Sequence, residues 1–543
     1  MTTSMRRLRP LAVLALSAGL TLPVIAPAVT AHRAHAAIVG ASDGVLRIAD
    51  EGVNDLSSID PPSPSASNAP SNVVENLVFG GLLRLDENLK VQPDAASSWT
   101  VSNDGKTYTF TLRPGLKFAD GVPVTADDVV YTINRAFAPA NSSGLTDYYL
   151  GHIVGGLAVS NKKAKTVSGI QAIGRDKVRI TLDQPEAVIL NQLAYVVAAI
   201  VPRHIVQKYG KNWTDHALGT GPFMVKQWQH RQEVDLVPNP YYWRGKPKLK
   251  AVNVLFVQNT ETAYNLFQTG GVDVMGLINF PSNHIKDVIG KPGTHEHAHL
   301  LTEFLQFNTR QAPFNNALVR RAFSYAVNRT TIATLLNNRV APAHSILPPG
   351  MPGYNTRAPG QTFNPTLAQQ LLAKAGYPDG KGFPKVTLAV NGGDPDGSTK
   401  ANALREFWKR VLHVDVALNQ LEYNAYIAAL NTHKLQMNFI QWGADYPDPQ
   451  DFLSLLLQTG AGGNNGGWEN PTFDRLTKQA DVMPHDSPQR YAMYRQAEQI
   501  ALNDAAIMVL DWQKDYILIN PAVHGLTTNS LGLVAPNWAT VTK

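Results

Sequence analysis

Polar and apolar side chains alternate at every second position from Thr107 to Leu112. This period of two is typical of a β-strand with one buried face. The pairs Asp104-Gly105 and Asp120-Gly121 on either side are turn signals, and Thr125 is a residue type that caps helix N-termini. The stretch therefore predicts a hairpin followed by a capped helix.

A helical period replaces this alternation in the second half of the chain. After Asn316, one helix face would collect Val319, Ala322, Phe323, Ala326 and Val327. The pairs Asn364-Pro365 and Ser487-Pro488 each place a capping residue before a proline, a pattern that opens helices. Apolar runs over Leu300 to Asn308 and Leu435 to Ile440 predict further strands. This mixture of strands and helices predicts an α/β fold.

The composition predicts a globular, exported protein. The chain has 543 residues, of which 44% are apolar and 17% charged, enough for about three domain-sized units. Residues 1–36 have the form of a signal peptide, with a basic start, an apolar segment from Leu11 to Val29 and an Ala34-His35-Ala36 cleavage site. Because Pro23 and Pro27 interrupt the apolar segment, we expect a signal that is removed and not a membrane anchor.

The net charge and the absence of cysteine exclude several kinds of partner and attachment. The predicted signal peptide holds four arginines and no acid, so its removal lowers the formal net charge from +6 to +2. A nucleic-acid partner is therefore not expected. The chain has no cysteine, which excludes disulfides, thiolate metal sites and lipid attachment through a cysteine. We expect a protein that is periplasmic or extracellular, soluble after cleavage and without a direct membrane anchor.

Four segments together resemble a known family. They are Asn103 to Arg135, Gly219 to Trp243 (GTGPF…NPYYW), Pro313 to Ala322 (PF…VRRA) and Gln441 to Phe452 (QWGADYPDPQDF). In this order they resemble the family 5 extracellular solute-binding proteins, the dipeptide, oligopeptide and nickel receptors of ABC importers. The resemblance extends from Leu46 to Asn520.

The resemblance implies a type II periplasmic-binding-protein fold of the cluster C architecture, with two lobes, hinge strands and an extra inserted domain. The hinge strands would lie near Leu301 to Phe307 and Tyr516 to Asn520. The implied boundaries are lobe I at 37–72, 216–300 and 518–543, the inserted domain at 73–215, and lobe II at 301–517.

Such a receptor closes its lobes over a ligand and makes or breaks no bond. The family resemblance thus implies a non-enzymatic monomer without a cofactor, which captures a short peptide and delivers it to an ABC permease in the membrane. Two alternatives stay open. The same scaffold would bind a metal chelate, an oligosaccharide or another metabolite, or the protein has been recruited to a biosynthetic pathway or to peptide sensing.

The family's W-x-x-D motif matches Trp442 to Asp445, and its aspartate holds the α-ammonium group of the peptide. This implies that Asp445 is the ammonium ligand. A carboxylate at a strand end can pair strongly with an ammonium group once closure expels water, and Trp442 can add a cation–π contact. Gly443 would act through its backbone amide. Ala444 and Tyr446 complete the candidates in this segment.

For the other acids and for the hinge-strand residues, a structural role is an alternative to a ligand-binding role. We interpret Asp448 and Asp451 as turn and helix-cap acids around two prolines. On the hinge strand, His299, Glu303, Phe304 and Asn308 are further ligand-binding candidates, and ordinary packing or exposure explains them equally well. Some family members place an arginine where this chain has Phe439, so the partner of the peptide carboxylate stays unassigned.

Three histidines suggest a rival, metal-binding function. His295, His297 and His299 alternate along one predicted strand and would face the same side. Residues two apart on a strand are about 6.6 Å apart, which makes chelation of one ion by three such side chains awkward. We therefore expect a solvated strand edge and no metal site.

Overall fold

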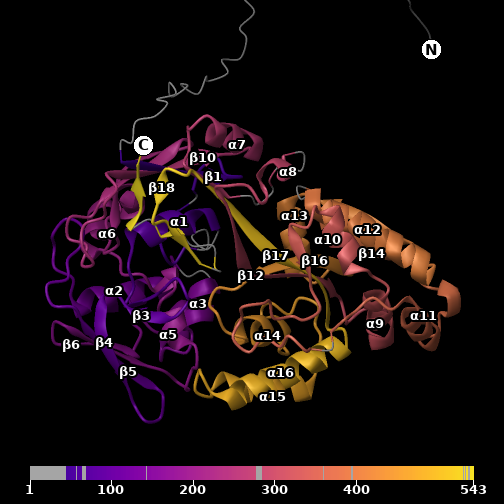
Figure 1. The fold of residues 1–543 in the computed structure, drawn as a ribbon. Helices are drawn as coiled ribbons and strands as arrows, with labels where there is room; N and C mark the ends of the chain where they lie inside the picture. Colours follow the sequence, from indigo (N-terminus) through magenta and orange to yellow (C-terminus); the bar gives the residue numbers. More distant parts are fainter. Residues whose placement is uncertain are drawn as a thin grey trace, which may run out of the picture.

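The computed structural model describes residues 44–542 except 57, 64–68, 142–143, 277–279, 281–283, 359, 393–394, 530, 532–533 and 536–537. The predicted signal peptide lies outside the described residues. Figure 1 shows two lobes connected by two long strands, with the first part of the chain in one lobe and the orange segments in the other.

An eleven-stranded sheet runs through both lobes. Its strand order is β15-β14-β16-β12-β17-β11-β1-β10-β9-β8, with β13 pairing separately with β17. The strands are β1 (Val45–Glu51), β8 (Phe223–Gln229), β9 (Glu233–Pro238), β10 (Ala251–Val257), β11 (Val274–Gly276), β12 (Thr294–Phe307), β13 (Val340–Pro342), β14 (Val386–Asn391), β15 (Val416–Leu421), β16 (Met437–Gly443) and β17 (Ile507–Ile519).

The long strands β12 and β17 lie side by side in the middle of this sheet and pass from one lobe into the other (Figure 1). They are antiparallel, and their register shifts between Ala298 and Thr302 and again between Glu303 and Phe304. Such bulges bend a strand and increase its local twist. Both strands are longer than predicted. The strand predicted from Leu300 begins at Thr294, and the strand predicted to end at Ile440 continues to Gly443.

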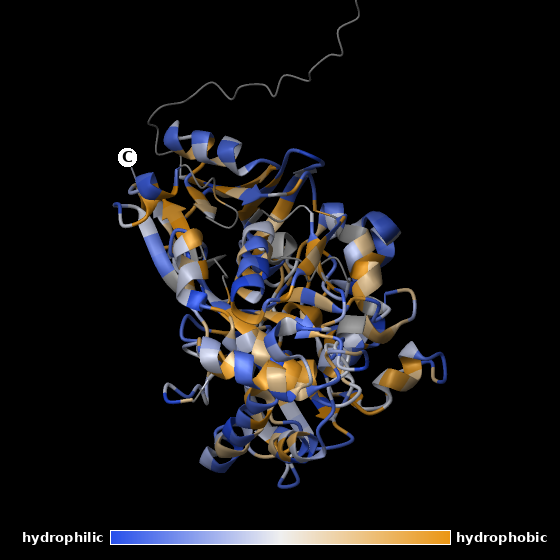
Figure 2. Cartoon of the chain, turned by 90° about the vertical axis from the view of Figure 1, so that its right-hand side faces the viewer, coloured by the Kyte–Doolittle hydropathy of each residue, from blue (hydrophilic) through white to orange (hydrophobic). Residues whose placement is uncertain are grey.

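Lobe I is built on β11, β1, β10, β9 and β8, and its core contains Leu46, Val254 and Phe223. Lobe II is built on β16, β14 and β15. Its core packs the helices of the second half of the chain against the sheet, with Phe323 and Trp408 buried between them. Figure 2 shows the strands coloured as mainly hydrophobic in the interior, while hydrophilic residues gather on the outer helices.

A third core is formed by residues 82–200, which we count with lobe I, together with Tyr446 of lobe II. It surrounds a four-stranded sheet of order β4-β5-β7-β6 and buries Phe110, Ile133 and Val178. The Ile200 N–H donates to the Gly80 carbonyl at 2.9 Å, so this segment leaves and rejoins lobe I at one place. Its strands are β4 (Ala96–Val101), β5 (Thr107–Leu112), β6 (Ile170–Ile173) and β7 (Lys177–Thr181).

The predicted hairpin strand and helix starts are confirmed. Strand β5 covers the alternating residues, and the carboxylate of Asp128 accepts a hydrogen bond from the Thr125 N–H at 2.8 Å where α2 (Ala126–Phe137) begins. Asn316, Asn364 and Ser487 cap α9 (Ala317–Tyr325), α11 (Pro365–Lys374) and α16 (Pro488–Asn503) through their side chains. Local capping chemistry therefore set these boundaries.

The remaining α-helices are α1 (Ala69–Val78), α3 (Gly144–Leu150), α4 (Gly156–Ser160), α5 (Ile189–Gln192), α6 (Arg203–Tyr209), α7 (Thr260–Gln268), α8 (Ile285–Val288), α10 (Arg329–Leu335), α12 (Pro395–Leu412), α13 (Tyr423–Asn431), α14 (Gln450–Leu457) and α15 (Pro471–Asp481). The short strands are β2 (Leu83–Leu85), β3 (Val91–Pro93), β18 (Val523–His524), β19 (Thr527–Thr528), β20 (Val534–Ala535) and β21 (Thr540–Val541). The 3₁₀ helices are η1 (Val196–Ala198), η2 (Gly210–His216) and η3 (Pro378–Gly380). Within the described part of the chain, no helix combines the length and apolarity needed to cross a bilayer.

Candidate functional site

The W-x-x-D segment is fixed to the central strand β12. Trp442 and Gly443, the last residues of β16, pair with Thr302 and Leu301. The Ala444 N–H then donates to the Leu300 carbonyl at 2.8 Å before the chain turns toward α14. Because β12 passes between the lobes, this pairing holds the segment beside the lobe junction.

Asp445 meets side chains from the other lobe. The Tyr195 hydroxyl, which belongs to the residue before η1, donates to Asp445 Oδ1 at 3.4 Å. Tyr149 of α3 lies 5.0 Å from Tyr195 and 6.2 Å from Tyr446 between ring centroids. Figure 1 accordingly shows α3 next to α14 at the centre of the molecule. The predicted ammonium ligand thus lies where the two lobes touch.

Asp451 lies directly behind Asp445 and is 0% exposed. Its Oδ2 atom accepts hydrogen bonds from the Trp442 indole N–H and the Asp445 N–H, both at 3.2 Å. Its Oδ1 atom has no hydrogen-bond partner among the described residues. The helix-cap interpretation of Asp451 is wrong, because α14 begins at Gln450 after Pro449 and the Asp451 side chain points back to the motif.

Asp448 has the predicted turn role and a second one. Its Oδ1 atom accepts from the Gln450 N–H at 2.9 Å, which confirms the turn. Its carboxylate also forms a bidentate pair with the Arg490 guanidinium, with both hydrogen bonds at 2.7 Å and both side chains 0% exposed. This ion pair neutralises Asp448, so we assign it to the structure of lobe II.

A second acid crosses the lobe junction nearby. Glu186 is 4% exposed, and its Oε1 atom accepts from the Gln450 amide at 2.9 Å. Its other oxygen lies 3.7 Å from His152 Nε2. The Ala187 N–H also donates to the Asp481 carbonyl at 3.2 Å. Sequence reasoning missed these contacts, because they join segments that have no motif of their own.

Burial controls the electrostatics of the junction. It raises the pKa of Asp445, and hydrogen bonds from Tyr149 and Tyr195 act in the opposite direction. Burial and repulsion by Asp445 raise the pKa of Asp451 well above its ordinary value. Burial also raises the pKa of Glu186 to about 7, against the effects of Gln450 and His152.

No lysine or arginine in the described parts of the chain forms an ion pair with Asp445 or Asp451. Both acids nevertheless lie in an environment that penalises unpaired charge. An ammonium group carries three N–H donors and one positive charge, and therefore supplies what the two carboxylates lack. The arrangement is suited to binding a cationic group.

Three of the four hinge-strand candidates lie inside lobe II. Phe304 is 1% exposed and belongs to a hydrophobic core. Glu303 is 5% exposed and accepts from Lys400 Nζ at 2.7 Å, and Asn308 is 4% exposed and donates to the His433 carbonyl at 3.0 Å. Tyr446 is 1% exposed and donates to Gln450. The structure therefore brings Trp442, Gly443, Ala444 and Tyr446 together with Asp445, and gives the three hinge-strand side chains structural partners.

The histidine strand is the beginning of β12. His295 is exposed and His299 is half-buried, while the side chain of His297 lies outside the described residues. Among the side chains that the structure describes, no three histidines or acids are grouped closely enough to hold a metal ion.

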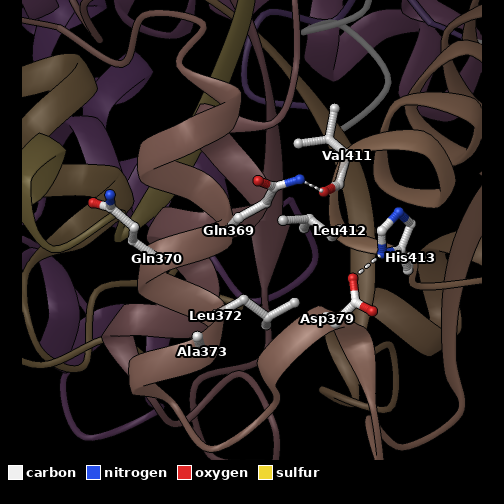
Figure 3. A pocket seen from close by; sticks show the side chains of 8 residues that line it. All are labelled: Gln369, Gln370, Leu372, Ala373, Asp379, Val411, Leu412 and His413. Carbon is white, nitrogen blue, oxygen red and sulfur yellow. Dashed lines mark hydrogen bonds and ion pairs between the residues drawn. The ribbon is translucent and has the colours of Figure 1, made fainter.

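A surface hollow of about 330 Å³ lies elsewhere in lobe II (Figure 3). Helix α11, η3 and the end of α12 form it, and a His413–Asp379 contact closes one side. The Gln369 amide donates to the Val411 carbonyl at 3.0 Å across the hollow. None of these elements contributes to the contacts around Asp445, so we do not include the hollow in the site.

Comparisons with known proteins agree with this architecture. The family model "Bacterial extracellular solute-binding proteins, family 5 Middle" matches residues 90–464. The chain is 30% identical over 506 residues to the dipeptide-binding protein DppE of Bacillus subtilis, covering 90% of each chain. It is also 30% identical to the probable deoxycholate-binding periplasmic protein YgiS of Escherichia coli, covering 87% of this chain and 89% of the relative.

Among solved structures, the murein tripeptide binding protein MppA of Escherichia coli superposes with a TM-score of 0.78 at 28% identity. The match covers 92% of this chain and 98% of MppA. The predicted two-lobe fold is therefore confirmed. From the motifs, the strand order and these matches, the chain belongs to family 5 of the bacterial extracellular solute-binding proteins.

Proposed function

We propose that this protein captures short peptides by closing its lobes and delivers them to an ABC permease. The observation that carries the proposal is the Asp445 carboxylate, which lies at the lobe junction, meets Tyr195 of the other lobe and has no cationic partner in the described part of the chain. A peptide supplies such a partner in its α-ammonium group. Two of the compared relatives, DppE and MppA, are named for peptide binding.

Asp445 would bind the α-ammonium group, and the neighbouring residues of the motif would contribute further contacts to the ligand. The Trp442 indole is oriented by its hydrogen bond to Asp451, so its ring can contribute a cation–π contact without reorganising. Gly443 and Ala444 are fixed on β12 through the backbone and contribute main-chain groups. Pre-oriented groups lose little conformational entropy on binding, which favours affinity.

The acids also argue against one alternative ligand. YgiS is named for binding deoxycholate, which carries a carboxylate. An anionic head group at Asp445 and Asp451 would place like charges together in a buried site, which is unfavourable. The local charge therefore favours a ligand with a cationic end.

We assign the division of the chain as follows: 37–72, 216–300 and 518–543 to lobe I, 73–215 to its inserted domain, and 301–517 to lobe II. The separate cores of residues 82–200 and of lobe II support this division. Strands β12 and β17 would act as the hinge, since they alone of the long strands lie in both lobes and contain register shifts.

We place the protein outside the cytoplasm as a monomer, with residues 1–36 acting as a removable signal. The word "periplasmic" in the name of YgiS supports this location.

Native mass spectrometry of the purified protein with a mixed library of di- to pentapeptides tests the proposal. We expect the wild type to retain peptides and Asp445→Asn to lose them, because the amide has no charge to pair with ammonium. Asp486→Asn is the matched control, since this aspartate of lobe II is 93% exposed. Retention of no peptide by the wild type would overturn the function, and equal retention by Asp445→Asn would overturn the role of Asp445.

A further inference from the structure

Glu75 is a buried acid in lobe I without a structural partner. It belongs to α1 and is 0% exposed. Both of its carboxylate oxygens are buried, and neither has a hydrogen-bond partner among the described residues. Burial raises the pKa of Glu75 well above its ordinary value, with a further contribution from Asp60. A carboxyl group in this condition is costly to the fold in either protonation state.

Glu75 lies near the acids of the lobe junction. Helix α1 packs against η1, the short helix that Tyr195 precedes. Tyr195 packs against both cores on this side of the molecule, while its hydroxyl donates to Asp445. Besides burial, Asp445 and Glu75 both raise the pKa of Tyr195. One phenol therefore lies within the electric field of an acid from each lobe.

The chain offers no cation to Glu75. The neighbouring Asp60 is already paired with Arg135, through hydrogen bonds of 2.7 Å and 2.5 Å. No ion pair of the described residues includes Glu75. Between positions 44 and 542, His297 of β12 is the one lysine, arginine or histidine whose side chain is not described. Neutralisation by a residue of this segment is therefore not available.

The site as a whole has more acceptors than one ammonium group satisfies. Asp445 and the unpartnered Oδ1 of Asp451 lie together, and one α-ammonium group can serve both. Glu75 belongs to the opposite lobe and leaves two further acceptor oxygens. A protonated Glu75 would still need an acceptor for its hydroxyl group. A second donor-rich, positively charged group from the ligand satisfies these oxygens and the charge together.

We propose that the site prefers peptides whose first residue is lysine or arginine, with the α-ammonium group at Asp445 and the side-chain cation directed to Glu75. This inference rests on the proposed peptide-binding function. The first residue is chosen because it carries both cationic groups on one short unit, and lobe closure places an acid of each lobe around the same tyrosine. The guanidinium and ammonium groups share the required chemistry, several N–H donors with one positive charge.

The test compares two tripeptides of similar shape by isothermal titration calorimetry. Lys-Ala-Ala carries the second cation, and norleucine-Ala-Ala has a similar aliphatic chain without the charge. We expect the wild type to bind Lys-Ala-Ala at least about tenfold more tightly, in line with a buried charge-assisted hydrogen bond. Glu75→Gln should remove this preference, so that the ratio of the two affinities falls to about one.

Glu498→Gln is the matched control. Glu498 is also a buried acid, 2% exposed, but it lies in lobe II and accepts hydrogen bonds from the Ile346 and Leu347 N–H groups. This variant should keep the preference. Equal wild-type affinity for the two tripeptides, or a preference unchanged in Glu75→Gln, overturns the inference and leaves peptide binding intact. Binding of neither tripeptide overturns both this inference and the proposed function, and the wild-type comparison decides even if Glu75→Gln does not fold.

Discussion

The buried acids of lobe II and those of the lobe junction differ in their partners. Inside lobe II, Asp448 pairs with Arg490, and Glu303 pairs with Lys400 at 2.7 Å. At the junction, the Asp445 carboxylate accepts hydrogen bonds from the hydroxyls of Tyr149 and Tyr195, and its backbone N–H donates to Asp451. The chain therefore neutralises Asp448 and Glu303 with its own cations, and it gives Asp445 and Asp451 no lysine or arginine partner among the described residues.

Under the proposed function, this difference separates acids that serve the fold from acids that bind the ligand. Two buried charges stabilise a fold only when they are paired with good geometry, and removal of one partner leaves the other uncompensated. An acid without a partner lowers the stability of the empty protein. The same acid gives a cationic ligand a large gain on binding, because the ligand removes that penalty. In the proposed function, an unpaired acid at the junction lowers the stability of the empty protein and raises its affinity for a cationic ligand.

The largest effect should come from breaking an internal pair. Lys400 is 1% exposed, and its ammonium group also lies 2.9 Å from Asp511 Oδ2. Lys400→Met leaves two buried carboxylates without their cation, and we expect the free energy of unfolding to fall by about 3–5 kcal/mol. Urea unfolding followed by circular dichroism measures this.

The control for this variant is Lys514→Met. Lys514 pairs with Glu296 at 3.3 Å on the surface, with side chains 34% and 53% exposed, and its loss should cost less than about 1 kcal/mol. Equal losses for the two variants would contradict the distinction between internal and exposed pairs.

Replacing Asp445 at the junction should lower ligand affinity and leave the stability of the fold intact. Asp445→Asn keeps an oxygen that can accept from Tyr195 but removes the charge, so we expect peptide affinity to fall about 100-fold, or about 2.7 kcal/mol. The free energy of unfolding at neutral pH should stay the same or rise, since burial raises the pKa of Asp445. Calorimetry gives the first quantity and urea unfolding the second. A loss of stability as large as that of Lys400→Met would mean that Asp445 serves the fold.

A smaller effect should appear at Glu498, which has backbone donors but no cation. Burial raises its pKa from 4.5 to about 7, against the hydrogen bonds from Leu347 and Ile346. The folded state therefore binds this proton more tightly than the unfolded state. The resulting stability is complete below pH 4.5 and is lost as the pH rises through 7.

Glu498→Gln retains an acceptor oxygen and cannot ionise. We expect the variant to match the wild type near pH 4 and to be more stable by about 2 kcal/mol at pH 6. Urea unfolding across this pH range measures the difference. A constant difference at all pH values would show that Glu498 does not titrate between the two states.

Sequence reasoning recovered features whose causes are local. The alternation in β5 and the caps at Asn364 and Ser487 depend on residues within one turn, so a single sequence contains them. The family motif identified the Trp442 to Asp445 segment, and the structure places it at the lobe junction.

The rest of the site depends on contacts between distant segments. Tyr195 lies 250 positions before Asp445, and neither its neighbours nor Glu75 carry a motif. For the hinge-strand candidates, the sequence could not predict which side of the strand each side chain faces. Two register shifts interrupt β12, so the rule that alternate residues face alternate sides cannot be counted through to Phe304.

The hydrogen bond between Ile200 and Gly80 brings together the two ends of the segment between them, which we call the cassette. Its two ends meet, so a different loop of almost any length can replace it without moving the strands that bear the hinge. Tyr149 and Tyr195 both belong to this cassette, while Asp445 belongs to the frame. A single contiguous stretch of the gene therefore encodes the side of the lobe junction that faces Asp445, and the strands between the lobes are encoded outside it.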